Sequence, residues 1–174
     1  MRITTLPFLA LALCFMFACS KKEDEPKPNN ELKGSWKATD ISYTGTSTTS
    51  VSGFTASSNF TGTGYDLNLT IKFDENPNIY TTSGNYSIKL ATNINGQTMN
   101  KNYTNQSFLD GGSWSKQGNE LSITSKTTGA LQKATILELT STTLKMGYNT
   151  SQTTEQNGAT VSVTIAGTYT FKRL

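Results

Sequence analysis

Apolar and polar residues alternate along several stretches of the chain, most regularly over 65–73. An alternation with a period of two predicts a β-strand that buries one face and exposes the other. Shorter stretches repeat the pattern at 121–123, 137–139, 144–148 and 161–171. We expect the apolar side chains of these strands to point into one shared interior. They include Leu67, Leu69, Ile71, Phe73, Leu137, Leu139, Met146, Tyr148, Val161 and Val163.

Weaker alternation predicts four more strands, at 35–44, 78–92, 98–108 and 110–117. Gly-Asn and Asn-Gly pairs between the strands are typical of hairpin turns. Beyond the N-terminal leader, no segment repeats apolar residues at the helical period, so we expect no substantial helix. The pattern therefore predicts an all-β fold of eight or nine antiparallel strands. An up-and-down barrel or a two-sheet sandwich would satisfy it, and the barrel is favoured because it leaves no exposed edge.

The first residues of the chain form a separate segment. Leu6 to Phe17 is almost wholly apolar and ends at Ala18, directly before Cys19. The run is shorter than the roughly 20 residues that span a bilayer and has the size of a secretory signal. It resembles a lipoprotein signal, in which 1–18 is removed and Cys19 receives acyl chains such as palmitate. A plain signal peptide and an uncleaved anchor helix are the alternatives.

Residues 19–30 contain charged residues, two prolines and no large apolar side chain. Such a segment cannot bury apolar surface, so we expect it to be a flexible tether. Its Lys22 to Glu25 stretch resembles an export signal of some outer-membrane lipoproteins. We therefore expect the protein in the cell envelope, as an outer-membrane lipoprotein, with exposure on the outer face as a further expectation. Residues 31–174 remain for one barrel domain.

Composition removes several functions from consideration. Without the leader the chain has 14 basic and 12 acidic side chains, a net charge of +2 that is too small to indicate nucleic-acid binding. There is no histidine, and Cys19 is the only cysteine outside the leader. Ser-His-Asp and Cys-His catalytic groups and the common zinc sites therefore cannot be assembled. We expect no enzyme activity, no cofactor and no metal site.

Four segments together are similar to a known family, at 32–37, 112–123, 136–146 and 167–173. The first carries Gly34-Ser35-Trp36 and resembles the Gly-x-Trp opening of lipocalins and other calycins. The other three resemble a bacterial family of lipocalin-like lipoproteins. The resemblance implies a calycin-type barrel on a secreted lipoprotein and implies no particular ligand. This chain differs from lipocalins by a polar insertion, Thr44 to Gly64, and by the absence of a final helix.

In lipocalins, the opening tryptophan packs at the closed end of the barrel against a basic side chain from near the last strand. The resemblance assigns the first role to Trp36. Arg173 is the only arginine outside the leader and ends the last predicted strand. We therefore expect a cation–π contact between Trp36 and Arg173 that closes the barrel. The alternative is an Arg173 side chain that lies free in solvent.

Two binding hypotheses follow. In the first, the barrel binds a small apolar or amphipathic ligand inside or at its mouth. In the second, the core is filled and the loop 44–64 binds a partner protein, as an inhibitor or an envelope-assembly accessory would. That loop could also be a lid or an extra hairpin packed on the barrel mouth. The expected partners are the membrane, through the lipid, and one small ligand, with a monomeric domain. Candidate ligand contacts are Phe54, Phe60, Leu69, Ile71, Phe73, Met146 and Tyr148.

Overall fold

The computed structural model describes residues 31–174, apart from the Gln156 side chain. The predicted signal peptide, Cys19 and the tether lie outside the described residues. The described part is all β, and none of it forms a helix long and apolar enough to cross a membrane. Its strands are β1 (Gly34–Val51), β2 (Phe54–Tyr65), β3 (Thr70–Asp74), β4 (Ile79–Ser83), β5 (Tyr86–Ile94), β6 (Gln97–Gln106), β7 (Gly112–Gln117), β8 (Glu120–Ser125), β9 (Leu131–Leu139), β10 (Thr143–Gln156) and β11 (Ala159–Arg173).

Eight of these strands form a closed antiparallel barrel. They follow one another in the order β1, β3, β4, β7, β8, β9, β10 and β11, and β11 pairs again with β1. Neighbours in the barrel are neighbours in the sequence once β2, β5 and β6 are set aside. The predicted all-β class and up-and-down barrel, of the lipocalin-like type, are therefore confirmed.

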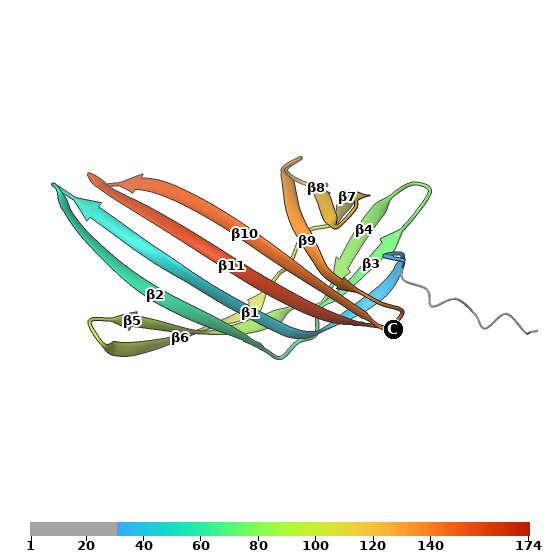
Figure 1. The fold of residues 1–174 in the computed structure, drawn as a ribbon, viewed down its shortest axis with the longest axis horizontal. Coiled ribbons are helices and arrows are strands. Elements are labelled where there is room, and N and C mark those ends of the chain that lie inside the picture. The colour runs from blue at the N-terminus through green and yellow to red at the C-terminus, as the bar shows by residue number, and fades with distance from the viewer. Residues whose placement is uncertain (1–30) are drawn as a thin grey trace, which may run out of the picture.

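The remaining strands extend the barrel into an open sheet, which we call the wing. β1 pairs with β3 only through Gly34–Lys37 and then with β2 through Ser42–Val51. On the other side, β9 pairs with β10 no further than Gly147. The long ends of β10, β11 and β1 therefore leave the barrel and continue with β2, β5 and β6 as a six-stranded sheet. Figure 1 shows the wing sweeping away from the short strands of the barrel.

The apolar core fills the end of the barrel that is farther from the wing. Side chains of β1, β3, β4, β8, β10 and β11, and that of the residue just before β3, are excluded from solvent there. Each stabilises the fold by about 1.5–3 kcal/mol relative to an exposed side chain. The largest of them are Trp36, Tyr80, Phe73, Phe171, Ile41, Leu69, Ile71, Leu121 and Leu144.

The polar insertion 44–64 forms a hairpin of β1 and β2 rather than a loop. The two strands turn at Ser52 and Gly53, both of which have positive φ. Threonine and serine suit the pleated surface, and they bond across the pair on one face. The hydroxyl pairs Thr48–Ser57 and Ser50–Thr55 are both at 2.9 Å. The segment is therefore an extra hairpin, as one of the possibilities had it, but the hairpin extends the sheet of the wing and is not packed on the barrel mouth.

Three expected core positions are wrong. Leu137 is 55% exposed, because β9 carries a bulge there. Glu138 faces Lys145 and Ile136 faces Met146, so Leu137 is the extra residue that pairs with nothing. Val161 and Val163 are half-buried on the wing and lie outside the barrel.

The strand predicted over 65–73 is also shorter than expected. β3 begins only at Thr70, and Asp66 has a positive φ of 51° within a bend. Leu67 lies in that segment and packs on the core while half-buried. The strand predicted over 78–92 is divided at Gly84 into β4 and β5.

Candidate ligand site at the barrel mouth

A pocket of about 400 Å³ lies where the barrel opens toward the wing, and we call it the mouth pocket. It opens beside the point at which β9 separates from β10. Apolar walls come from Phe108, Leu109, Ile123, Ala134 and Met146. Hydroxyl and other polar groups come from Tyr86, Tyr148, Tyr169, Ser107, Asp110, Ser125, Thr128 and Gln132.

Three phenols form a hydrogen-bonded chain at the base of the mouth pocket. The Tyr43 hydroxyl lies 3.2 Å from the Tyr86 hydroxyl and in close contact with that of Tyr169. Burial raises the pKa of Tyr43 and of Tyr169 well above the usual range, so both phenols are neutral at physiological pH. The hydroxyls of Tyr86 and Tyr169, which line the pocket, can each donate or accept a hydrogen bond.

Aromatic rings surround this polar group. The Phe108 ring lies 4.7 Å from the Tyr169 ring, between centroids. Tyr43 meets Tyr169 edge to face at 5.6 Å. Phe108 belongs to the segment 107–111, which joins β6 to β7 and covers one side of the mouth pocket. The site therefore combines apolar walls with phenol hydroxyls that can donate or accept a hydrogen bond.

Asp110 fastens this covering segment to the end of β8. Its carboxylate accepts the Ser125 hydroxyl at 2.9 Å and the Thr127 backbone N–H at 3.1 Å. The carbonyl oxygen of Leu109 accepts the Thr82 hydroxyl of β4. Hydrogen bonds to the end of β8 and to β4 therefore hold Phe108 and Leu109 over the mouth pocket.

The Asp110 contacts predict a small dependence of stability on acid. Hydrogen bonds from Thr127 and Ser125 lower the pKa of the Asp110 carboxyl. A lowered native pKa stabilises the fold above the unfolded value of about 3.9, and this contribution is lost as the pH falls through the native value. Asp110→Asn removes the titration. Thermal unfolding between pH 5 and pH 2 should therefore show a smaller loss of stability for the variant than for the wild type; equal losses would contradict the role of Asp110.

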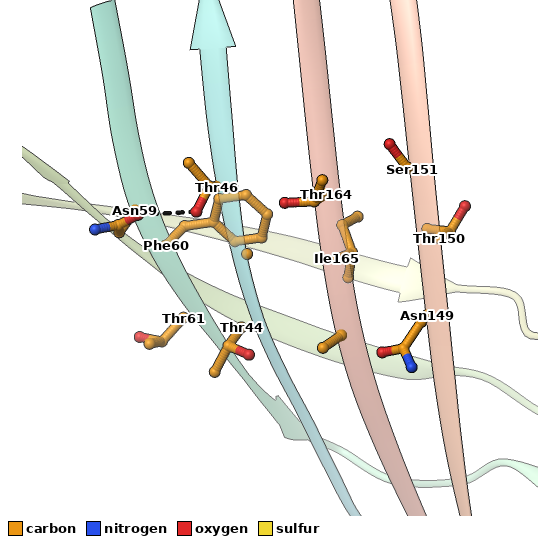
Figure 2. Close-up of a pocket in the computed structure, with 12 residues that line it drawn as sticks. Thr44, Thr46, Asn59, Phe60, Thr61, Asn149, Thr150, Ser151, Thr164 and Ile165 are labelled. Carbon is orange, nitrogen blue, oxygen red and sulfur yellow. Dashed lines mark hydrogen bonds between the residues drawn. The ribbon is translucent and has the colours of Figure 1, made fainter. Parts of the chain in front are cut away.

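A second hollow, of about 750 Å³, lies open along the wing. Figure 2 shows that β1, β2, β10 and β11 line it mostly with Thr, Asn and Ser side chains. Phe60 and Ile165 are its large apolar members, and the Phe60 ring lies over Gly45. A Cβ at Gly45 would come within 2.2 Å of that ring, so the glycine makes room for it. This hollow is larger than the mouth pocket but has no enclosing wall.

The predicted ligand contacts are divided among four places. Met146 and Tyr148 line the mouth pocket, and Phe60 lines the hollow on the wing. Phe54 is 83% exposed at the tip of the β1–β2 hairpin. The core side chains Leu69, Ile71 and Phe73 are fully packed and line none of these hollows.

Sequence reasoning missed the residues that define the mouth pocket. Tyr43, Tyr86 and Tyr169 come from three strands that are far apart in the sequence, so no spacing connects them. Phe108 stands at the end of a weakly alternating stretch. Only Tyr169 had a signal, because it continues the alternation of the last strand.

The expected contact at the closed end of the barrel is present. The Arg173 guanidinium carbon lies 4.1 Å from the centroid of the Trp36 ring, and Trp36 is fully buried. The indole N–H donates to the Leu32 carbonyl at 2.8 Å. The guanidinium donates to three backbone carbonyls at 2.6–2.7 Å, those of Glu31, Lys33 and Ser141.

Comparison of the chain with protein-family models, curated proteins and solved structures finds no match. The assignment of the fold therefore depends on the strand order and on the pairing of β11 with β1.

Proposed function

We propose that this protein is a non-enzymatic, membrane-anchored lipoprotein of a lipocalin-like family that binds a small amphipathic ligand at the mouth of its barrel. The observation that carries the proposal is the mouth pocket, in which apolar walls surround the hydroxyl groups of Tyr86 and Tyr169. Its volume of about 400 Å³ lies in the usual range for small-molecule sites.

The lining of the pocket favours an uncharged polar group on the ligand. Neither lysine nor arginine lines it, and its one carboxylate, on Asp110, already accepts two hydrogen bonds. An anionic group would be repelled by Asp110. A carbonyl, ester or ether oxygen would instead accept the proton of Tyr86 or Tyr169, with the apolar part against Phe108 and Met146.

The proposed anchor is compatible with an accessible pocket. The chain enters the described domain at the closed end, where Arg173 binds the carbonyl of Glu31. The mouth pocket lies on the side toward the wing. A lipid on Cys19 would therefore attach the domain to the outer membrane through the closed end and leave the mouth free.

Filling the pocket should prevent binding. Gln132 is half-buried and lines the pocket, whereas its neighbour Lys133 points outward and is exposed. Gln132→Trp should weaken binding of prodan, a neutral fluorescent ketone with an apolar ring system, by about tenfold or more, which is a loss of about 1.4 kcal/mol. Lys133→Trp adds the same side chain outside the pocket and should leave the affinity unchanged.

Fluorescence titration of the two variants and the wild type tests the proposal. Equal affinities in all three, or no saturable binding by the wild type, would refute it. If the wild type binds prodan and Gln132→Trp weakens the binding, native mass spectrometry of the protein purified from its own membranes would identify the natural ligand.

A second function is favoured by one separate observation. Phe54 is 83% exposed at the tip of the β1–β2 hairpin, beside the exposed Val51. An interaction module that binds a partner protein through the segment 44–64, above a filled barrel end, is the alternative that these side chains support.

A further inference from the structure

The wing ends in two edges that no described strand covers. On one side, β6 pairs only with β5. On the other, β10 pairs with β11 along its whole length but has no second neighbour from Tyr148 onward. Each edge presents backbone N–H and C=O groups that can pair with another strand.

The edge of β6 carries a residue that discourages such pairing. Lys101 lies near the middle of the strand, opposite Leu90, and its ammonium group lies 4.9 Å from the centroid of the Tyr103 ring. A lysine in the middle of an edge strand opposes the addition of a further strand, because its charge would have to be covered.

The edge of β10 has no such protection. The stretch from Tyr148 to Thr154 contains neither a charged residue nor a proline, and Glu155 is the first charge along it. Its alternate residues are uncharged on both faces of the sheet. The backbone of β10 is therefore open to pairing with a further strand from Tyr148 to Thr154.

The unpaired edge of β10 begins next to the mouth pocket. β9 separates from β10 after Thr135 faces Gly147, and Figure 1 shows the two strands diverging from there. Ala134 and Gln132 of β9 border the pocket on one side and Tyr148 borders it on the other. This slot is bounded by one strand on each side, so we expect it to accept a single extended segment more readily than the sheet of a second copy.

We propose that β10 binds an extended segment of a partner protein, which pairs with Tyr148–Glu155 as an additional antiparallel strand of the wing. Backbone hydrogen bonds would supply the affinity, and alternate side chains the specificity. The segment carries a bulky apolar residue opposite Tyr148, which enters the mouth pocket, and a basic residue opposite Glu155. Uncharged β-branched residues lie between them. This interaction goes beyond the proposed binding of a small ligand.

The test uses the full protein and a synthetic peptide, acetyl-Lys-Thr-Thr-Val-Thr-Val-Thr-Phe-amide. Hydrogen exchange followed by mass spectrometry should show that the peptide slows exchange over 148–155 and leaves β6, an equally exposed edge, unchanged. Two versions of the peptide, N-methylated at one or the other set of alternate amides, separate backbone pairing from other contacts. Only one set faces β10, so one version should bind and the other should not.

A matched pair of variants completes the experiment. Gln152→Lys places on β10 the kind of charge that β6 carries, and should weaken peptide binding by about tenfold. Lys101→Gln should leave the protection of the β10 amides unchanged. The proposal is overturned if about 1 mM peptide protects no β10 amide, if β6 is protected as well, or if both methylated peptides bind equally. Protection of β10 that rises with protein concentration alone would identify a second copy as the occupant and overturn it too.

Failure of this test and failure of the small-ligand proposal are distinguishable. The exchange experiment reports on the β10 backbone, and the prodan titration reports on the pocket. Loss of prodan binding in Gln132→Trp without any peptide protection would leave the pocket as the only site.

Discussion

Arg173→Ala is expected to lower the free energy of unfolding by about 3 kcal/mol, since hydrogen bonds from charged groups contribute about 1.5–3 kcal/mol each and Arg173 is partly exposed. The guanidinium stacks on the Trp36 ring and holds three carbonyl oxygens from two different segments of the chain. Alanine would leave these carbonyls to water and uncover the indole. The first strand, the last strand and the turn before β10 would all lose their common contact.

Urea denaturation of a double-mutant cycle measures the part that comes from the aromatic ring. Trp36→Leu removes the π system, and its own loss cancels in the cycle. We expect a coupling of about 1–2 kcal/mol between Trp36→Leu and Arg173→Ala. Arg173→Lys keeps the charge but cannot reach three carbonyls, so it should recover only part of the loss. Additive effects of the two replacements would refute the contact.

The second large effect is expected from Gly112→Ala, at the start of β7. A Cβ at this position would lie 1.9 Å from the carbonyl oxygen of Thr124, which is backbone and cannot turn aside. The φ of Gly112 is +153°, which also disfavours a side chain. We expect a loss of more than about 3 kcal/mol, because relief of the overlap would require β7 to move from β8.

Gly118→Ala is the matched control for this variant. Gly118 also has a positive φ, of 58°, but nothing lies within 4 Å of an added Cβ. Its replacement should cost only about 1 kcal/mol, from backbone strain. Gly112 directly follows the segment 107–111 that covers the mouth pocket, so Gly112→Ala should also weaken prodan binding. Similar stabilities for the two alanine variants would contradict the packing described for β7 and β8.

The strands with clear alternation were predictable, and so was the contact that closes the barrel. Leu144, Met146, Tyr169 and Phe171 point inward because their pattern is uninterrupted. Leu137 departs from its pattern because a single extra residue reverses which face the following side chains occupy. Nothing local marks that bulge, which is defined by the pairing of β9 with β10.

The candidate site was largely unpredictable for a related reason. The phenol chain depends on Tyr43, Tyr86 and Tyr169, whose hydroxyls meet only after β1, β5 and β11 are placed in one sheet. Met146 and Tyr148 were predicted as ligand contacts, and they line the mouth pocket because they stand on the inward face of a well-marked strand. Leu69, Ile71 and Phe73 have the same pattern and lie in the packed core instead. Alternation tells which face is buried and does not tell whether side chains or a ligand fill it.

The sequence by itself determined that residues 31–174 are all β, because the period of alternation is a property of each strand alone. It also excluded catalytic groups that contain histidine, because the sequence has none. Only the tertiary structure decided which strands close the barrel and which extend it. β1 has one continuous pattern but two partners, β3 for its first residues and β2 for its last. The choice between partners depends on contacts across the whole chain, and it creates both the mouth pocket and the open edge of β10.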